Sequence, residues 1–123
     1  MARVFAYSQE VSHEWRRRAT LREFREGLLP LDELCDADFL LKAAARFHGE
    51  PSPRPCPICG KELRVVKWVY GDRLGRRAGT ARQDDEIEQL VAEFGPISVH
   101  FVEVCPHCSW NHLLKEVTAT PVM

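Results

Sequence analysis

Two copies of the motif Cys-Pro-x-Cys, one beginning at Cys56 and the other at Cys105, constrain the fold of this chain more than any other feature. A tight turn of this kind places two sulfur atoms on one side of the backbone, about 2.3 Å from a shared zinc ion. Pro57 and Pro106 preset the backbone at each bend, and Gly60 tolerates a positive φ angle. Two turns supply the four ligands of a tetrahedral site. We therefore predict one structural Zn²⁺ bound by Cys56, Cys59, Cys105 and Cys108.

The chain has a fifth cysteine, Cys35, and several histidines that could compete for this role. Free cysteine behaves as a small apolar residue, so we expect Cys35 to be buried. With four sulfurs available, a histidine ligand is the less favoured alternative. The thiols could also form redox pairs, but a thioredoxin-like motif belongs in a βαβ unit, whereas the strand before Cys105 is expected to enter a hairpin. A closed four-sulfur site has no open position for a substrate, so we expect no enzymatic activity.

The hydrophobic pattern predicts an α+β fold, with N-terminal helices followed by a zinc-ribbon-like antiparallel sheet that contains an inserted short helix. The 45 residues between Cys59 and Cys105 exceed the roughly 15 to 20 of the simplest four-cysteine pattern, which leaves room for that helix. The prolines of GEPSPRP form a stiff connector. We therefore divide the chain into a helical segment, 1–49, and a zinc-ribbon domain, 50–123. The expected helices are 12–27, 37–47 and 83–95, and the expected strands are 62–71, 97–104 and 109–119.

The composition is that of a folded protein, with 45% apolar and 28% charged residues in 123. No run approaches the roughly 20 apolar residues of a membrane span, and the first residues do not resemble a secretory signal. The odd number of cysteines, five, does not suit a disulfide framework. We therefore expect a cytoplasmic protein with reduced thiols and no membrane partner.

Arginines supply the candidate partner-binding surface. The loop RLGRRAGTAR combines four arginines with small neighbours, a composition that can lie close to phosphates. The expected N-terminal helix carries further arginines, with Ser12 as its cap and the arginines facing outward. Either run could also be an ordinary solvated surface. Trp68 and Trp110 could stack on bases, although packing beside the zinc is the commoner role. The candidate binding residues are Arg73, Arg76, Arg77, Arg82, Arg16 and Arg17.

Four stretches of the sequence together resemble a family of small actinobacterial proteins classed as a domain of unknown function. The resemblance covers about residues 15–117 and implies a cytoplasmic actinobacterial protein whose cysteines match the four of the family. It implies no activity. The stretches that carry it are LCDADFLLKAAARFHGEPS, CPICGKEL, WVYGDRLGRRAGTAR and VHFVEVCPHCSWNHLLK.

Three functions fit these observations. The first is a non-enzymatic zinc-binding adaptor of transcription that contacts RNA polymerase or nucleic acid through the arginines and has no small-molecule substrate. The second is a protein-interaction module with purely structural zinc, whose acidic helix 84–94 meets a basic partner. The third is a redox-sensitive thiol switch that releases zinc on oxidation.

Overall fold

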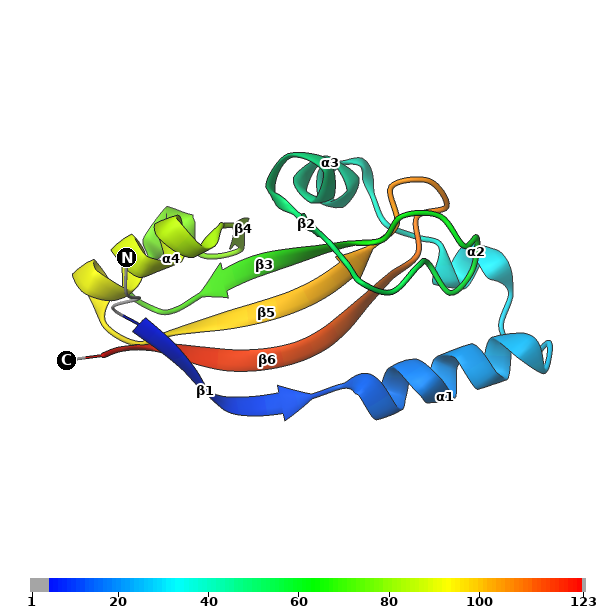
Figure 1. The fold of residues 1–123 in the computed structure, drawn as a ribbon, viewed down its shortest axis with the longest axis horizontal. Coiled ribbons are helices and arrows are strands. Elements are labelled where there is room, and N and C mark those ends of the chain that lie inside the picture. The colour runs from blue at the N-terminus through cyan, green and yellow to red at the C-terminus, as the bar shows by residue number, and fades with distance from the viewer. Residues whose placement is uncertain (1–4, 123) are drawn as a thin grey trace.

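The computed structural model describes residues 5–122, and it has the α+β class that the sequence predicted. A sheet of six strands runs along the molecule, with α4 at one end and α2 beside the two cysteine turns at the other (Figure 1). The strand order is β1-β6-β5-β3-β2, and β4 pairs with β3. The strands are β1 (Phe5–Ser12), β2 (Glu50–Pro51), β3 (Arg64–Tyr70), β4 (Thr80–Ala81), β5 (Ile97–Val104) and β6 (Asn111–Pro121). The helices are α1 (Glu14–Arg25), α2 (Leu31–Leu34), α3 (Phe39–His48) and α4 (Asp84–Phe94), with a 3₁₀ turn η1 (Gly75–Arg77).

The centre of the sheet is an antiparallel row of valines. Val69 of β3 pairs with Val99 of β5, which pairs with Val117 of β6, and all three are buried. Helix α4 packs its Ile87 and Val91 into the same cluster. Because side chains alternate along a strand, these positions share one face of the sheet. The inserted helix predicted between the cysteine turns therefore covers this face.

Helix α3 covers the opposite face. Val66 of β3 and Val104 of β5 form a second cluster with Ala44 and Ala45 of α3. Val66 lies three positions from Val69, so the two side chains point to opposite sides of the sheet. Small residues on α3 let the helix lie close to the strands. The two faces thus have separate cores, one under α4 and one under α3.

Strand β1 is the main element that the sequence reasoning missed. It pairs with β6 at the edge of the sheet, so the first 49 residues contain a strand as well as the expected helices. Only Phe5 in this strand is buried, and its polar residues give no clear apolar alternation. The register shifts between Ser8 and Val11, where Gln9 adopts a φ of 52°. Such a polar, irregular edge strand lacks the usual sequence signal of a strand.

The beginning and the packing of α1 differ from the prediction. Ser12 is not the N-cap, because the helix begins after His13; the Ser12 hydroxyl instead accepts a bond from the Glu14 backbone N–H at 3.3 Å. The expectation that the arginines face outward is wrong for Arg17, which is only 8% exposed. Trp15, a large apolar residue of the same helix, is 59% exposed. The packed side of α1 therefore combines the apolar Leu21 with the charged Arg17, and hydrophobic periodicity cannot detect the second.

No helix among residues 5–122 is both long enough and apolar enough to cross a lipid bilayer.

Candidate metal centre

The two cysteine turns meet at one end of the sheet. The first turn leads into β3 and the second follows β5, and the pairing of Arg64 with Val104 holds the adjoining strand ends side by side. In Figure 1 both turns lie at the same end of the molecule, next to α2. The strand, loop and helix between the two turns therefore bring the second turn back beside the first, as the sequence predicted.

The turns have the same backbone hydrogen bonds. In the first, the N–H of Cys56 donates to the carbonyl of Lys61 at 2.8 Å, and the N–H of Gly60 donates to the carbonyl of Cys56 at 3.0 Å. In the second, Cys105 and Trp110 form the equivalent bond at 2.8 Å, and Ser109 and Cys105 form the other at 3.0 Å. Gly60 has a φ of 77° and Ser109 a φ of 72°. Each turn thus requires the left-handed conformation at its fifth residue, and the second adopts it without glycine.

The four sulfur atoms lie within 4.8 Å of one another. Cys56 Sγ is 3.6 Å from Cys108 Sγ, and Cys59 Sγ is 3.5 Å from Cys105 Sγ, so the close pairs join the two turns. A tetrahedral ion with metal–sulfur bonds of about 2.3 Å separates its ligands by about 3.8 Å. The arrangement is therefore compatible with one metal ion bound by both turns.

Backbone N–H groups point at the sulfurs. The N–H of Ile58 donates to Cys56 Sγ, and that of Cys108 donates to Cys105 Sγ, both at 3.4 Å. Burial raises the pKa of the Cys56 and Cys108 thiols. For Cys59, desolvation also acts to raise the pKa, but hydrogen bonds from the Lys61 backbone and from neighbouring thiols together lower it. A bound cation would favour the thiolate form at all four positions, so metal binding releases protons here.

The metal centre has its own hydrophobic core. Cys56 and Cys105 are buried among Leu21 of α1, Leu34 of α2 and Trp110. Trp110 is 1% exposed, so it packs beside the sulfurs and cannot stack on a base. The N-terminal helices thus pack against the two cysteine turns, and a bound metal would help to hold them there.

A buried carboxylate next to this core was not found by sequence reasoning. Glu103 is 0% exposed, and its Oε2 accepts bonds from Arg17 Nε at 2.6 Å and from Trp110 Nε1 at 2.7 Å. Its Oε1 accepts a bond from Arg54 at 3.0 Å, and Arg54 also binds Glu14 at 2.8 Å. The side-chain hydrogen bond with Arg54 is the main cause that lowers the pKa of Glu14. The available signal was the position of Glu103, which alternates with the buried Ile97 and Val99 on one face of β5.

Cys35 lies beside the metal centre instead of in the interior. It is half-buried, and its Sγ is 3.9 Å from Cys108 Sγ. Two bonds hold this segment to the second turn: Ala37 N–H to the Ser109 carbonyl at 3.0 Å, and Asn111 Nδ2 to Asp36 Oδ1 at 2.8 Å. Burial raises the pKa of the Cys35 thiol. The predicted burial of Cys35 is therefore only partial, because docking onto the second turn leaves this thiol at the edge of the core.

Among residues 5–122, no histidine belongs to the group of side chains that could hold a metal ion together with the four sulfurs. His107 is exposed within the second turn. His100 pairs with Glu116 at 3.3 Å, and His112 stacks on Trp110 with ring centres 5.9 Å apart. Burial lowers the pKa of His112. These histidines contact strands and neighbouring side chains, and the group compatible with a metal contains cysteines alone.

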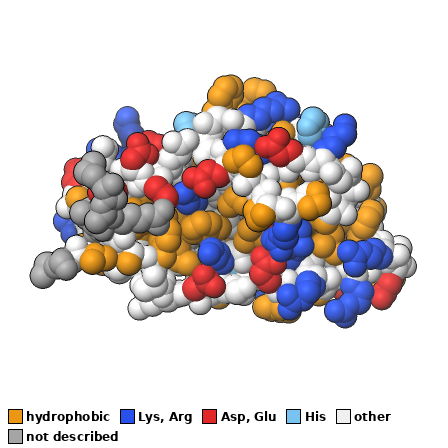
Figure 2. All heavy atoms as spheres, in the orientation of Figure 1, with side chains coloured by type: hydrophobic (Ala, Val, Ile, Leu, Met, Phe, Trp, Pro, Cys, Tyr) orange, Lys and Arg blue, Asp and Glu red, His pale blue; other side chains and the backbone are white. Residues whose placement is uncertain are grey.

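The candidate arginines do not form one surface. Arg73, Arg76 and Arg77 are exposed on the loop that joins β3 to β4, whereas α1 lies at the other end of the molecule (Figure 1). Figure 2 shows Lys and Arg side chains gathered over the region of α1. Two members of the predicted set are already paired. Arg17 is buried against Glu103, which removes it from any binding surface, and Arg82 binds Glu86 at 3.1 Å.

Residues 4–120 match the model of the family of unknown function DUF5318. The chain is 50% identical over 101 residues to the uncharacterized proteins Mb0050 of Mycobacterium bovis and Rv0049 of Mycobacterium tuberculosis, an overlap of 81% of this chain and 74% of each relative. No solved structure matches it. The chain therefore belongs to the DUF5318 family, which confirms the resemblance to an actinobacterial family of unknown function.

Proposed function

We propose that this member of the DUF5318 family is a non-enzymatic zinc-binding adaptor that contacts nucleic acid or RNA polymerase in the cytoplasm. The observation that carries the proposal is the closed set of four sulfurs, all within 4.8 Å of one another. Four thiolates suit tetrahedral Zn²⁺ and leave no vacant position for water or substrate. Binding to such sites is worth about 10–16 kcal/mol, comparable with the net stability of about 5–15 kcal/mol of a domain. The role of the ion is thus to stabilise the fold.

The binding surface in this proposal is the loop that joins β3 to β4, residues 71–79, which contains η1 and is called the η1 loop. Arg73 donates to the Phe94 carbonyl at 3.4 Å, and the Arg77 guanidinium lies 5.3 Å from the centre of the Phe94 ring. None of the ion pairs found among the described residues involves Arg73, Arg76 or Arg77. Contacts with Phe94 of α4 orient Arg73 and Arg77 without neutralising their charges, and Arg76 is exposed on the same loop. They are therefore available to a polyanion.

The test compares two triple variants with equal loss of charge. One replaces Arg73, Arg76 and Arg77 by Gln, and the control replaces the exposed Arg18, Arg22 and Arg25 of α1 by Gln. Binding of each zinc-loaded protein to single- and double-stranded nucleic acid and to purified RNA polymerase is measured over a range of salt. The loop variant should bind more weakly and lose up to about 3 units from the salt slope on duplex DNA, with the control close to wild type.

If wild type and the loop variant bind nucleic acid and RNA polymerase equally well, Arg73, Arg76 and Arg77 do not form the binding surface. A partner that is captured from cells after nuclease treatment and at high salt, without affinity for nucleic acid, would instead identify a protein-interaction module.

A second candidate function, a redox-sensitive switch, is favoured by the 3.9 Å between Cys35 Sγ and Cys108 Sγ. Four sulfurs complete the tetrahedron, so Cys35 is surplus to coordination. The Cys108 thiolate can attack a peroxide, taking one oxygen as a sulfenic acid and releasing hydroxide or an alcohol. The Cys35 thiol then attacks that sulfur, forming a disulfide and releasing water. One ligand of the zinc is lost.

This candidate is tested by following zinc release with a chromogenic chelator during peroxide treatment. Wild type should release zinc, form a disulfide between Cys35 and Cys108 detectable by peptide mass spectrometry, and rebind zinc after reduction. The variant Cys35→Ser should form no such disulfide. After reduction it should rebind less zinc than wild type, because the sulfenic acid on Cys108 is then open to further, irreversible oxidation. Identical recovery in the two proteins would remove the role of Cys35.

A further inference from the structure

The outer side of α3 carries an exposed apolar stripe. The helix packs Leu41, Ala44 and Ala45 toward the sheet. On its other side Phe39 and Phe47 are each 77% exposed and Leu40 is 73% exposed. Figure 2 shows hydrophobic side chains gathered at the top of the molecule, over the position of α3 in Figure 1. Large apolar side chains gathered in this way on a soluble protein mark an interaction surface.

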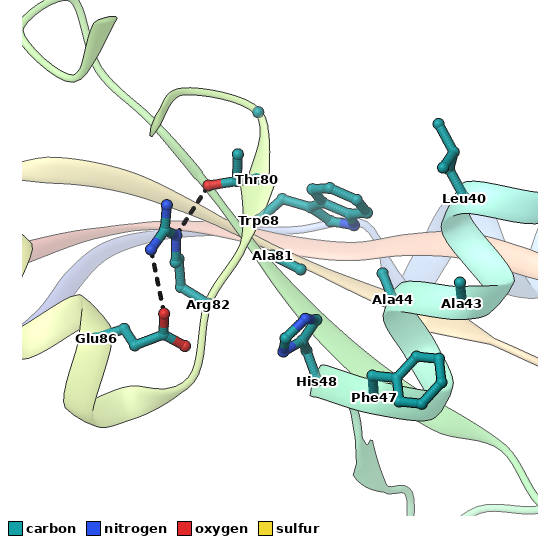
Figure 3. A pocket seen from close by; sticks show the side chains of 11 residues that line it. Leu40, Ala43, Ala44, Phe47, His48, Trp68, Thr80, Ala81, Arg82 and Glu86 are labelled. Carbon is teal, nitrogen blue, oxygen red and sulfur yellow. Dashed lines mark hydrogen bonds and ion pairs between the residues drawn. The ribbon is translucent and has the colours of Figure 1, made fainter. Parts of the chain in front are cut away.

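A groove of about 520 Å³ runs beside this stripe, between α3 and β4. Its walls include Trp68 and Ala81 from the sheet and Ala43 and Ala44 from the helix. Figure 3 shows Leu40 and Phe47 projecting from two ends of α3 with the alanines between them, while the Arg82–Glu86 pair closes the side opposite the helix. The space between the two large side chains is of a size and polarity that suit another large apolar side chain.

We infer that this stripe is a dimer interface that pairs α3 with α3 of a second copy in antiparallel orientation. Ala43 is four residues from Phe39 and four residues from Phe47. If two helices cross antiparallel at Ala43, Phe47 of each copy lies against Phe39 and Leu40 of the other. The small side chain of Ala43 at the crossing allows the helix axes to approach to about 8 Å. The pattern is therefore self-complementary, as a two-fold interface requires.

The charges at the ends of α3 favour the antiparallel orientation. Asp36 and Asp38 are exposed at its beginning, and Arg46 and His48 are exposed at its end. Antiparallel pairing places the acidic end of one helix beside the basic end of the other, and it also opposes the two helix dipoles. Lys42 of each copy flanks the crossing and can keep its ammonium group in water. A parallel pair would bring like charges together at both ends.

The area available matches a reversible dimer. A whole aromatic side chain buries about 150–250 Å², so the exposed parts of Phe39, Leu40 and Phe47 offer about 400 Å² per copy. Two copies give about 800 Å², and the rim of the groove brings the total close to the ~1,000 Å² of a specific interface. We expect dissociation in the micromolar range, as for a small interface of this kind.

The test is analytical ultracentrifugation of the zinc-loaded full chain over a range of concentrations. Wild type should show a monomer–dimer equilibrium, and Phe47→Glu should weaken dimerisation at least 30-fold. The control is Leu28→Glu, which changes a residue of similar exposure, 67%, on the segment that follows α1, and should dimerise like wild type. Circular dichroism and zinc content identify any variant that fails to fold.

A charge-complementation experiment tests the antiparallel geometry directly. The variant Phe39→Glu/Phe47→Lys carries opposite charges at the two positions, so each Glu faces a Lys of the other copy in an antiparallel pair, whereas like charges meet in a parallel pair. This variant should form a homodimer that dissociates at high salt, and the like-charge variant Phe39→Lys/Phe47→Lys should be monomeric. A wild type that is monomeric at every concentration, a Phe47→Glu variant as dimeric as wild type, or a Phe39→Glu/Phe47→Lys variant that stays monomeric would each overturn the inference.

Discussion

Replacing Glu103 by Gln should be among the most destabilising conservative changes in this protein. The carboxylate is 0% exposed and accepts bonds from Arg17 at 2.6 Å, Trp110 at 2.7 Å and Arg54 at 3.0 Å. Glutamine has the same shape, so no cavity forms, but its amide must place an NH₂ group against one of these donors. A buried donor without an acceptor costs about 1–3 kcal/mol. With the charge of Arg17 also uncompensated, we expect a loss of about 3–5 kcal/mol.

Urea unfolding of the zinc-loaded protein, followed by circular dichroism, measures this loss. The control is Glu62→Gln, because Glu62 is 60% exposed and pairs with Arg64 at 2.9 Å on the surface. That pair should contribute less than about 1 kcal/mol. The midpoint of Glu103→Gln should shift with little change in the slope. A shift no larger than that of the control would refute the argument that the buried network stabilises the fold.

Three further predictions concern the metal ligands, the left-handed residues of the two turns, and Glu116 in the sheet. Removal of zinc by a chelator, or the substitution Cys108→Ser, should abolish most of the cooperative unfolding transition measured by calorimetry. The variant Cys35→Ser should still bind one zinc ion per chain, measured by elemental analysis, because Cys35 lies outside the four-sulfur set. Ser109→Gly should raise the free energy of unfolding by about 0.5–1 kcal/mol, because glycine adopts the left-handed backbone conformation without strain. Gly60→Ser should lower it by about 1 kcal/mol. A Cβ atom at Gly60 meets nothing within 4 Å, so the backbone strain is the only cost. A hydrogen bond with His13 lowers the pKa of Glu116, so this group stabilises the fold above its ordinary value of 4.5 and loses that effect as the pH falls through the lowered pKa. Glu116→Gln should therefore be less stable than wild type at pH 6, by well under about 1 kcal/mol for a side chain 39% exposed, and this difference in the free energy of unfolding should shrink as the pH falls below 4.5.

The clustering of the four sulfurs could be predicted from the sequence because each cysteine turn is a local structure. Cys56 and Cys105 are each followed by a proline and by a second cysteine, and the bonds that form the turns span four or five residues. The same is true of α4, whose capping box joins Gln83 to Glu86. Such features depend on residues close in sequence, where spacing and backbone preference suffice.

The features that the sequence reasoning missed depend on residues far apart in the chain. Arg17 and Glu103 are 86 positions apart, and Arg54 and Glu103 are 49 apart. Neither partner shows by its type that it is buried, since arginine and glutamate are mostly exposed. Strand β1 is another such case, because its partner β6 lies at the other end of the sequence and its own residues do not alternate regularly between apolar and polar.

The position of Arg17 shows why charge runs are weak evidence of a binding surface. In the run Trp15 to Arg18, three consecutive arginines point in different directions around the helix, so at most part of the run can face one partner. The structure directs Arg17 inward, where Glu103 neutralises it, and leaves Arg16 and Arg18 in water. On the loop of η1, by contrast, Phe94 contacts two of the three arginines without neutralising either. Geometry, and not the number of positive charges, therefore makes the η1 loop the better candidate for binding a polyanion.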